Sequence, residues 1–177
     1  MIIPLAEREL KTKFGDYTET LYYDGQAESI ALVMGDVEGV ENVLCRIHSA
    51  CLGGHVFNSV ECECADEMAA AQAAIQQAGR GVIIYLDQEG KGNGHLALMK
   101  SIPFKKVGLS QSEAYEKAGY KTDARSFRPA AKILNELKVK SVVLLTNNPE
   151  KADDLRRASI IVSETRKIRA PAEKLLG

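Results

Sequence analysis

The spacing of apolar and polar positions changes along the chain, and the change divides it into two parts. In the first third, short apolar runs end at turn residues. They predict a strand or hairpin around Tyr17–Tyr23, closed by the turn dipeptide Asp24-Gly25, and further strands over 29–34 and 42–47. We expect the residues before the first of these to be a lead-in segment. This third is therefore predicted to be mostly β.

The back two thirds alternate between helical and buried-strand patterns. Asp66 and Gly79 are typical start and stop residues of an Ala-rich helix, Ser110 and Glu113 form a capping box, and Pro129 suits a first helical turn. Continuous apolar runs are typical of strands buried on both faces. The predicted helices are 66–78, 110–118, 129–138 and 149–158, and the predicted strands are 81–86, 141–145 and 160–162. This alternation predicts an α/β fold with parallel strands.

The length and the charge balance of the chain limit the kinds of function that it can have. With 177 residues, we expect a single domain over 1–177, with a polar and mobile tail over 164–177. The 23 basic and 24 acidic residues nearly balance, which argues against a nucleic-acid binder but is compatible with a small anionic ligand. No secretory signal and no run of the ~18 apolar residues needed to span a membrane is found. We expect a cytoplasmic protein that binds neither membrane nor nucleic acid.

Three cysteines are the first candidates for chemistry. Cys51, Cys62 and Cys64 follow the spacing C-x10-C-x-C, and thiolates suit zinc, which keeps an open coordination position when only three protein groups hold it. The alternative is that they are small buried residues. Acidic neighbours of the last two, and a Gly-Gly turn after the first, do not resemble a packed core. Cys45 lies in an apolar run and is predicted to be core.

Two polar loops follow predicted strands, at 87–95 and 146–151. Ligands of such sheets bind outside the carboxyl ends of the strands, so these loops are the expected walls of a site. They contain a carboxylate, Glu89, and two cations, Lys91 and Lys151, together with backbone amides suited to an anion. Taken alone, the glycine-rich part is equally typical of a flexible surface loop.

Five segments of the chain carry a recognisable pattern when they are taken together. They are Arg46-Ile47-His48-Ser49-Ala50-Cys51, Glu61-Cys62-Glu63-Cys64, Asp87-Gln88-Glu89-Gly90-Lys91, Asp123-Ala124-Arg125-Ser126-Phe127 and Leu144-Leu145-Thr146-Asn147-Asn148-Pro149-Glu150-Lys151. With these segments the chain resembles the GTP cyclohydrolase II family, whose members open the guanine ring of GTP at the start of riboflavin synthesis. The resemblance covers about residues 30–165 and implies a layered α/β/α fold with a mixed, partly parallel sheet, and a homodimer.

The resemblance also implies catalytic roles. The three cysteines match the family's zinc ligands, and a water made acidic by the metal would attack C8 of the guanine imidazole, with formate expelled later. Arg125 matches the residue proposed to take the α-phosphate as pyrophosphate leaves, and Asp123 matches the proposed proton acceptor. Two plainer alternatives stay open: Arg125 only clamps phosphate, or the two residues form a structural ion pair.

Further positions match those that hold the nucleotide, chiefly its phosphates, with Mg²⁺ neutralising the triphosphate. Each of these residues, taken alone, is more typical of a solvated surface. They are Arg46, Glu89, Gly90, Lys91, Thr146 and Lys151, with Glu67 and Gln111 at two further substrate-binding positions.

Several of these positions depart from the family pattern. Glu67 stands where the family usually has Gln, Lys91 where it has Arg, and Gln111 where it has Thr; Ile102 stands where it has a Tyr thought to assist ring hydrolysis. Gln to Glu exchanges donors for a charge, and Arg to Lys loses bidentate phosphate binding. We therefore expect altered substrate recognition: a modified guanine nucleotide as substrate, or a ring-opened product that keeps its formyl group.

His55 and His95 are titratable groups near the predicted site. Either is a candidate replacement for the missing Tyr as proton donor, or an exposed loop histidine without a role.

Two rival functions remain. One is a catalytically silent nucleotide-binding protein with a structural zinc. The other is a deaminase-like zinc centre, for which the expected His-x-Glu and Cys-x-x-Cys arrangement is lacking.

Overall fold

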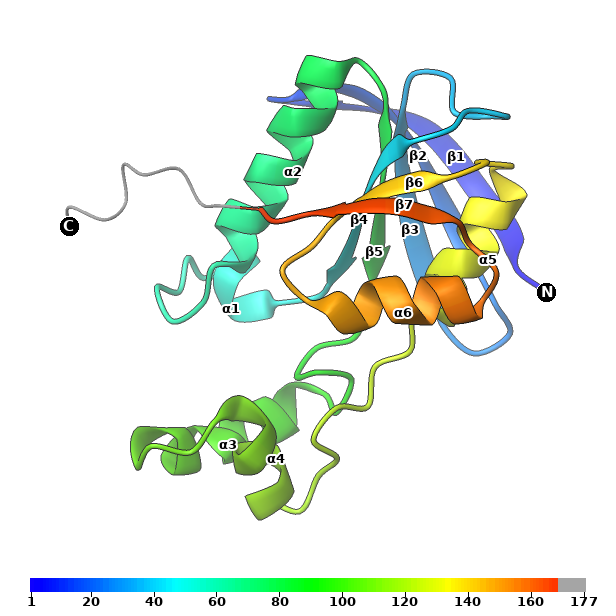
Figure 1. Ribbon diagram of the computed structural model, residues 1–177. Coiled ribbons are helices and arrows are strands. Elements are labelled where there is room, and N and C mark those ends of the chain that lie inside the picture. Colours follow the sequence, from blue (N-terminus) through cyan, green and yellow to red (C-terminus); the bar gives the residue numbers. More distant parts are fainter. Residues whose placement is uncertain (169–177) are drawn as a thin grey trace.

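A seven-stranded sheet forms the middle of the molecule in the computed structural model, which describes residues 1–168 (Figure 1). The strand order is β1-β2-β3-β5-β4-β6-β7. The first four of these pair antiparallel, and β5, β4, β6 and β7 pair parallel. The strands are β1 Ile3–Thr12, β2 Gly15–Tyr23, β3 Glu28–Met34, β4 Val43–Ser49, β5 Gly81–Leu86, β6 Val142–Leu145 and β7 Val162–Arg166. The expected mixed, partly parallel sheet is confirmed.

Helices cover both faces of this sheet. Ile75 of α2 packs against Ile83 of β5 on one face, whereas α5 and α6 pack on the other face, around Ile47 of β4. The predicted α/β/α layering is therefore confirmed. The helices are α1 Leu52–His55, α2 Cys64–Ala78, α3 His95–Lys106, α4 Gln111–Lys117, α5 Arg128–Glu136 and α6 Pro149–Arg157.

Strand β4 lies near the middle of the sheet and distributes its side chains by the two-residue alternation of a strand. Cys45 and Ile47 enter the core shared with α5 and α6, and both are fully buried. Burial raises the pKa of the Cys45 thiol to about 12, so it stays protonated at neutral pH. The prediction that this cysteine belongs to the core is confirmed. Arg46 and His48 point to the opposite face, towards α2.

Local sequence signals account for most helix ends. Gly79 ends α2 in the left-handed conformation, with φ of 68°, and the capping box of Ser110 and Glu113 is formed at the start of α4. The predicted cap at Asp66 is wrong, because α2 begins two residues earlier, with Glu63 as its N-cap. Asp66 lies instead in the first turn, where a carboxylate is favourable beside the positive end of the helix dipole.

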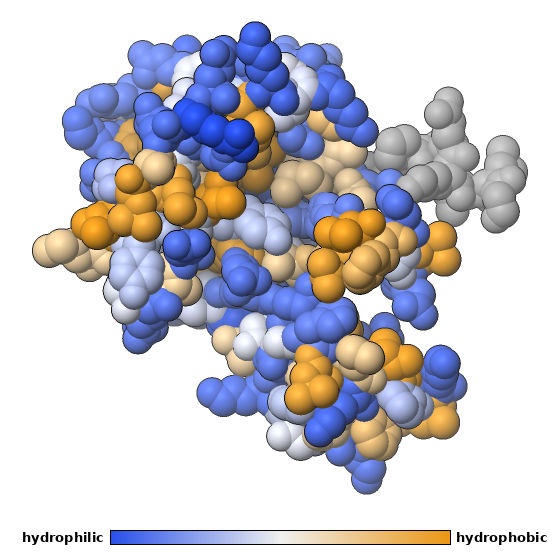
Figure 2. All heavy atoms as spheres, turned by 180° about the vertical axis from the view of Figure 1, so that it is seen from behind, coloured by the Kyte–Doolittle hydropathy of each residue, from blue (hydrophilic) through white to orange (hydrophobic). Residues whose placement is uncertain are grey.

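The two helices α1 and α3 have no counterpart in the predicted elements. Helix α3 contains Pro103 in its interior and buries only Ala97 and Ser101, so it has neither the composition nor the apolar stripe of a typical helix. Helix α1 spans four residues, two of them glycines, in a segment predicted to be a turn. Helices α3 and α4 pack on each other and form a smaller lobe beyond the sheet (Figures 1 and 2).

The C-terminal strand also differs from its prediction. The strand expected over 160–162 is found at Val162–Arg166, so the polar segment expected from residue 164 onward begins inside β7. Strand β7 lies at the edge of the sheet and is held by backbone hydrogen bonds to β6, and its side chains after Val162 are exposed. Because these exposed residues are polar, the sequence shows no apolar run that would predict a strand here. The rest of the predicted tail, 169–177, lies outside the described residues. Within residues 1–168, no helix has the length and apolar character needed to cross a membrane.

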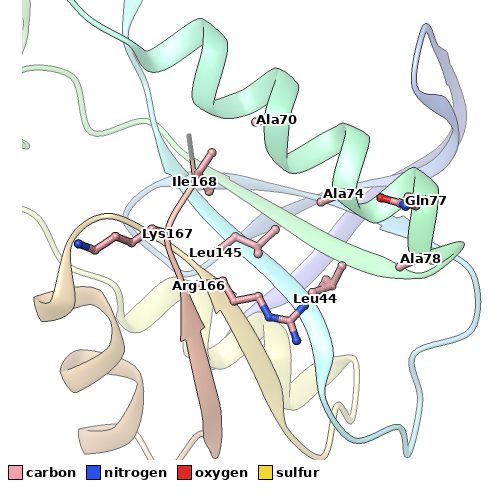
Figure 3. A pocket seen from close by; sticks show the side chains of 9 residues that line it. All are labelled: Leu44, Ala70, Ala74, Gln77, Ala78, Leu145, Arg166, Lys167 and Ile168. Atoms are coloured by element: carbon pink, nitrogen blue, oxygen red, sulfur yellow. The ribbon is translucent and has the colours of Figure 1, made fainter. Parts of the chain in front are cut away.

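Small side chains on α2 leave a hollow between this helix and the sheet (Figure 3). Ala70, Ala74 and Ala78 recur at four-residue spacing and face Leu44 and Leu145, and the hollow measures about 520 Å³. Larger residues at this spacing would fill the space, so the hollow depends on the three alanines.

Close packing between α2 and β5 makes Gly81 a test of the fold. A Cβ at this position would meet the Ile75 side chain at 2.6–3.0 Å. Gly81→Ala should therefore lower the free energy of unfolding by about 1–3 kcal/mol through overpacking, measured by urea denaturation. In an Ile75→Ala background the same substitution should cost clearly less, because the clashing atoms are gone. Equal costs in both backgrounds would contradict this packing.

Candidate active site

Three loops meet at the carboxyl ends of the parallel strands β4, β5 and β6. Cys51 follows β4, the loop 87–94 follows β5, and the loop 146–148 follows β6. Parallel strands end at the same edge of a sheet, so these loops are brought together by the topology. Glu89 joins two of them, because its carboxylate accepts a hydrogen bond from the backbone N–H of Leu52 in α1 at 2.7 Å. The prediction that both polar loops flank one site agrees with this arrangement.

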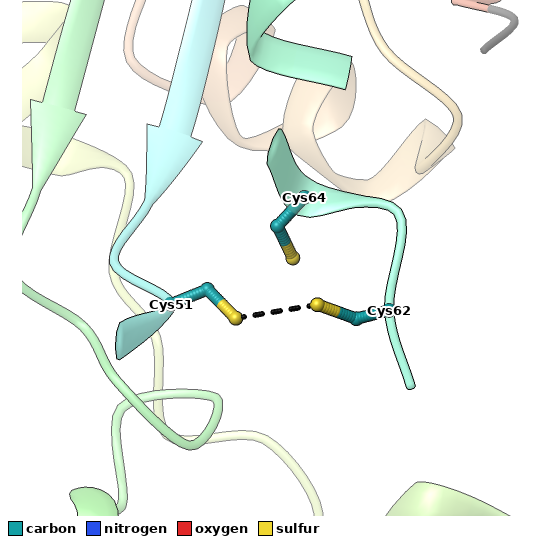
Figure 4. A group of neighbouring side chains, drawn as sticks. All are labelled: Cys51, Cys62 and Cys64. Carbon is teal, nitrogen blue, oxygen red and sulfur yellow. Dashed lines mark hydrogen bonds between the residues drawn. The ribbon is translucent and has the colours of Figure 1, made fainter. Parts of the chain in front are cut away.

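The side chains of Cys51, Cys62 and Cys64 point towards one another at this edge (Figure 4). Their Sγ atoms all lie within 4.8 Å of one another, and those of Cys51 and Cys62 are 3.5 Å apart. In a tetrahedral site with zinc–sulfur bonds of about 2.3 Å, neighbouring sulfurs are about 3.8 Å apart. The three thiols are therefore close enough to hold one metal ion.

Gly54 makes room for this cluster. A Cβ at Gly54 would lie 2.9 Å from the Sγ of Cys62 and 3.4 Å from the Sγ of Cys51. Its backbone N–H points at the same cluster and donates to the Sγ of Cys51 at 3.4 Å. Helix α1 therefore presents a backbone surface, with no side chain, to the sulfurs.

The thiols of this cluster lose their protons readily only when a positive charge is close by. Burial raises the pKa of Cys51 and of Cys64, so both thiols hold their protons when no positive charge is near. A bound metal ion reverses this preference, because the coordinating thiol is deprotonated. Cys64 also lies in the first turn of α2, where the helix dipole favours negative charge.

Arg46 is a buried charge that ties three elements together. It is only 3% exposed, and its guanidinium forms an ion pair with Glu67 of α2. It also donates to the carbonyl oxygen of Leu145 at 3.1 Å, and the other oxygen of Glu67 accepts from the amide of Asn147 at 3.0 Å. Much of the hydrogen-bonding capacity of Arg46 is thus used inside the protein.

A pair of histidines connects β4 to the loop that carries the cysteines. The Nε2 atoms of His48 and His55 are 2.8 Å apart. Burial, followed by the charge of Arg46, lowers the pKa of His48 to about 3, so its ring is neutral. Arg46 has only donors and faces Nδ1 of His48, so His48 carries its proton on Nε2 and donates it to His55. This bond lies about one helical turn from Cys51 and holds α1 against the sheet.

A second cationic region lies beside the sulfur cluster. The carboxylate of Asp123 holds the guanidinium of Arg125 at 2.5–3.1 Å, and the pKa of Asp123 is lowered by these bonds despite its burial. Two cations lie near the ring of Phe127: the Arg125 Cζ and the Lys151 Nζ are each 5.5 Å from its ring centre. The geometry of the Asp123–Arg125 pair is equally consistent with a role of both residues in catalysis and with a purely structural ion pair.

Lys151 was predicted in a polar loop and is found buried, at 6% exposure, in the first turn of α6. Its ammonium donates to the carbonyl oxygen of Ile47 at 2.9 Å. Burial, together with the nearby charges of Arg46 and Arg125, lowers its pKa to about 7. It therefore titrates near neutrality.

The remaining predicted substrate-binding residues lie around these two regions. Thr146 is buried and bonds to the backbone of Asn148. Lys91 donates to the hydroxyl of Ser112 at 3.0 Å, so it reaches α4. Position 90 requires glycine, because its φ is 61° and a Cβ there would lie 2.4 Å from the carbonyl oxygen of Gly94.

A cavity of about 290 Å³ opens beside the sulfur cluster, between the cysteine loop and the helices α3 and α4. Leu98 and Ile102 of α3 form an apolar part of its wall, and Gln111 adds an amide. The amide nitrogen of Gln111 donates to the hydroxyl of Ser101 at 3.0 Å. The cavity thus combines an apolar wall, an amide and two of the thiols, Cys51 and Cys62.

Comparison with known proteins agrees with this arrangement. Residues 4–167 match the family model described as GTP cyclohydrolase II. The chain belongs to the GTP cyclohydrolase II family.

Similarity to individual family members extends along most of the chain. It is 40% identical over 162 residues to GTP cyclohydrolase-2 of Actinobacillus succinogenes, covering 90% of this chain and 75% of that protein. It is 39% identical over 171 residues to the riboflavin biosynthesis protein RibBA of Bacillus mycoides, covering 96% of this chain. The chain spans only 43% of the length of that relative.

The fold has a counterpart among solved structures. The crystal structure of RibBX, a two domain 3,4-dihydroxy-2-butanone 4-phosphate synthase from A. baumannii, matches with a TM-score of 0.51. The match covers 96% of this chain and 40% of that chain at 16% identity, so it supports the fold alone.

Several other residues of this site were assigned no role from the sequence. His48 lies within the first of the five segments and Gly54 in the turn after Cys51, but their roles depend on contacts with His55 and with the sulfurs. Gln88 donates to the carbonyl oxygen of Ser126 at 2.6 Å and so joins the loop after β5 to the Asp123–Arg125 segment. For His48, the alternation with Arg46 along one strand was a usable signal. His95, the other histidine predicted near the site, begins α3 and is exposed.

The two glycines of α1 provide a matched test of the sulfur cluster. Gly54→Ala should weaken zinc binding by about tenfold or more, because its Cβ would displace the Sγ of Cys62. Gly53→Ala should leave the affinity nearly unchanged, since its Cβ meets only Ser59, at 3.6 Å. Competition with a chromophoric chelator measures both. Equal affinities for the two variants would contradict the proposed packing around the metal.

Proposed function

We propose that this protein is a zinc-dependent hydrolase that opens the imidazole ring of GTP or of a related guanine nucleotide, with release of pyrophosphate and formate. The observation that carries the proposal is the juxtaposition of three thiols with a cavity on one side and a cluster of cations on the other. A nucleotide has two chemically different ends that would suit these two regions: a flat base for the cavity and an anionic phosphate chain for the cations. Membership of the family supports the reaction class.

Cys51, Cys62 and Cys64 would hold the zinc ion. Three thiolates leave one coordination position open, and zinc bound in this way supplies Lewis acidity and makes water a nucleophile near neutral pH. The N-terminus of α2 and the amide of Gly54 stabilise the thiolates. The His48–His55 bond fixes α1, and through it Cys51, in position.

The cavity would take the guanine base. Leu98 and Ile102 provide apolar surface for its faces, and the carbonyl oxygen of Gln111 is left to accept a hydrogen bond, because its amide nitrogen is bound by Ser101. Guanine offers N–H donors on its pyrimidine edge, which match this acceptor. Ile102 has no hydroxyl to assist ring hydrolysis, so a modified guanine nucleotide or a formylated product stays an open alternative for this chain.

The phosphates would lie at the cationic side, with Mg²⁺ reducing their charge. Lys91, Arg125 and Lys151 supply positive charge there, and Glu89 and Gly90 shape the loop between the two ends. Asp123 orients Arg125 through paired hydrogen bonds and would accept its proton if Arg125 attacks the α-phosphate. If Arg125 only clamps the phosphate, the same bonds serve to position it.

The family resemblance also implies a homodimer, and we propose that state. A catalytically silent nucleotide-binding protein with a structural zinc is the second candidate. One observation favours it: Ile102, at the position of the family Tyr, lines the cavity beside the thiols.

Turnover of GTP separates these two functions. With GTP and Mg²⁺, the protein should release formate and pyrophosphate and lose the guanine absorbance band. Cys62→Ser should reduce the rate by at least about a hundredfold because it removes a metal ligand. Cys45→Ala, which changes a cysteine in the core, should keep the metal and the activity. Binding of GTP without any product would leave only the silent binder.

The titration of Lys151 gives a second prediction. With a pKa of about 7, this lysine is only about one-tenth protonated at pH 8. Phosphates favour the charged ammonium and raise the pKa again, so nucleotide binding at pH 8 should take up close to one proton more in the wild type than in Lys151→Gln. At pH 6 this difference should vanish, because Lys151 is already charged.

Calorimetric titration of a non-hydrolysable GTP analogue, repeated in buffers of different ionisation enthalpy, measures this proton uptake. Lys140→Gln serves as the control, since this lysine is exposed. An uptake at pH 8 that is the same in Lys151→Gln as in the wild type would show that phosphate does not reach Lys151.

A further inference from the structure

The cavity beside the sulfur cluster has two unlike walls. Leu98 and Ile102 of α3 contribute apolar side chains, and they lie on one face of the helix because they are four residues apart. On the side of α1, Gly53 and Gly54 contribute backbone without side chains. A ring between these walls gains apolar contact on one face and meets only backbone at the two glycines on the other. The cavity is therefore suited to a flat base.

Three charged side chains line the same cavity, and the family resemblance assigns a role to none of them. They are Glu61, Lys105 and Lys106. Within residues 1–168, none of the three forms an ion pair. The cavity thus offers a ligand one carboxylate that accepts hydrogen bonds and two ammonium groups that donate them.

The pyrimidine edge of guanine matches this set of groups. It presents N1–H and the 2-amino group as donors, next to O6 as an acceptor. A carboxylate can accept both donors side by side, and such charge-assisted hydrogen bonds are roughly twice as strong as neutral ones. The amide of Gln111 is a weaker partner, because it carries no charge and its nitrogen already bonds to Ser101. Adenine has the opposite pattern, an acceptor at N1 and a donor at the 6-amino group.

We infer that Glu61 determines the specificity for the base: its carboxylate binds N1–H and the 2-amino group of guanine, with Lys105 and Lys106 beside O6. In this orientation C8, at the other end of the purine, points towards Cys51 and Cys62, which line the same cavity. The inference rests on the proposed function for placing the base in the cavity and adds which edge of the base is recognised. Binding of the base does not itself require turnover.

The chain provides a matched control for Glu61. Glu61 and Glu63 are the two neighbours of Cys62 in the sequence, but only Glu61 lines the cavity. Glu63 is the N-cap residue of α2, and its side chain forms no capping hydrogen bond. Glu63→Gln therefore removes the same charge beside the same cysteine without changing the cavity.

Exchange of the carboxylate for an amide tests the inference. Guanosine and xanthosine monophosphates, GMP and XMP, differ in that xanthine has a 2-oxo group in place of the 2-amino group. At about 0.1 M salt, the wild type should bind GMP about tenfold or more tightly than XMP, because the 2-oxo group faces the carboxylate. In Glu61→Gln this preference should be lost or reversed, since the amide donates to the 2-oxo group. Glu63→Gln should keep the preference of the wild type.

Calorimetric titration gives the affinities, and their ratio is the quantity compared, because damage to the fold or to the metal site lowers both affinities together. Elemental analysis for zinc and thermal unfolding accompany each variant. The inference is wrong if the wild type does not prefer GMP, if Glu61→Gln keeps the ratio of the wild type, or if Glu63→Gln changes the ratio as much as Glu61→Gln does.

The same variants separate this inference from the proposed function. Turnover of GTP together with an unchanged ratio in Glu61→Gln would refute the role of Glu61 and leave the proposed hydrolase standing. The expected change of ratio in a protein that forms no product from GTP would refute the hydrolase and leave the role of Glu61 standing.

Discussion

The buried guanidinium of Arg46 is the group on which the geometry of the site depends. A charge removed from water is tolerated only when ion pairs and hydrogen bonds replace its solvation. Arg46 meets this requirement by binding Glu67 of α2, the carbonyl oxygen of Leu145 at the end of β6, and the ring of His48. Loss of Glu67 would leave this buried charge without its ion-pair partner. The helix that carries Cys64 and the loop that carries Thr146 are therefore held in a fixed relation to β4.

The segment 51–64, which carries the three cysteines, is held by contacts of a different kind. Its first part, helix α1, is fixed by the neutral His48–His55 pair and by the bond from Leu52 to Glu89. Gly54 lets the three sulfurs approach without a side chain between them. A cluster of three partly buried thiols is unfavourable in its charged form unless a cation is present, so the fold brings together three groups that could hold a metal ion.

The cationic side of the site is arranged around Phe127. The cationic groups of Arg125 and Lys151 both lie 5.5 Å from the centre of its ring, and Asp123 forms an ion pair with Arg125. Burial makes the charge of Lys151 depend on pH near neutrality, whereas an arginine is charged at every accessible pH. Of these two cations, Arg125 therefore supplies the permanent charge, and Lys151, whose ammonium bonds to the carbonyl oxygen of Ile47 in β4, supplies a charge that varies with pH.

Local patterns in the sequence determined the strands β5 and β6, the C-terminal end of α2, the start of α4, the core position of Cys45 and the grouping of the three cysteines as a candidate metal site. Each depends on neighbouring residues: an apolar run, a capping box, a glycine after a helix, or a characteristic spacing. Helix α3, with Pro103 inside it, carried no such pattern and became visible only through its packing on α4. The same holds for the burial of Arg46, His48 and Lys151. These features join segments far apart in the chain, and only the tertiary structure decides which distant side chains share a low-dielectric interior or a common surface.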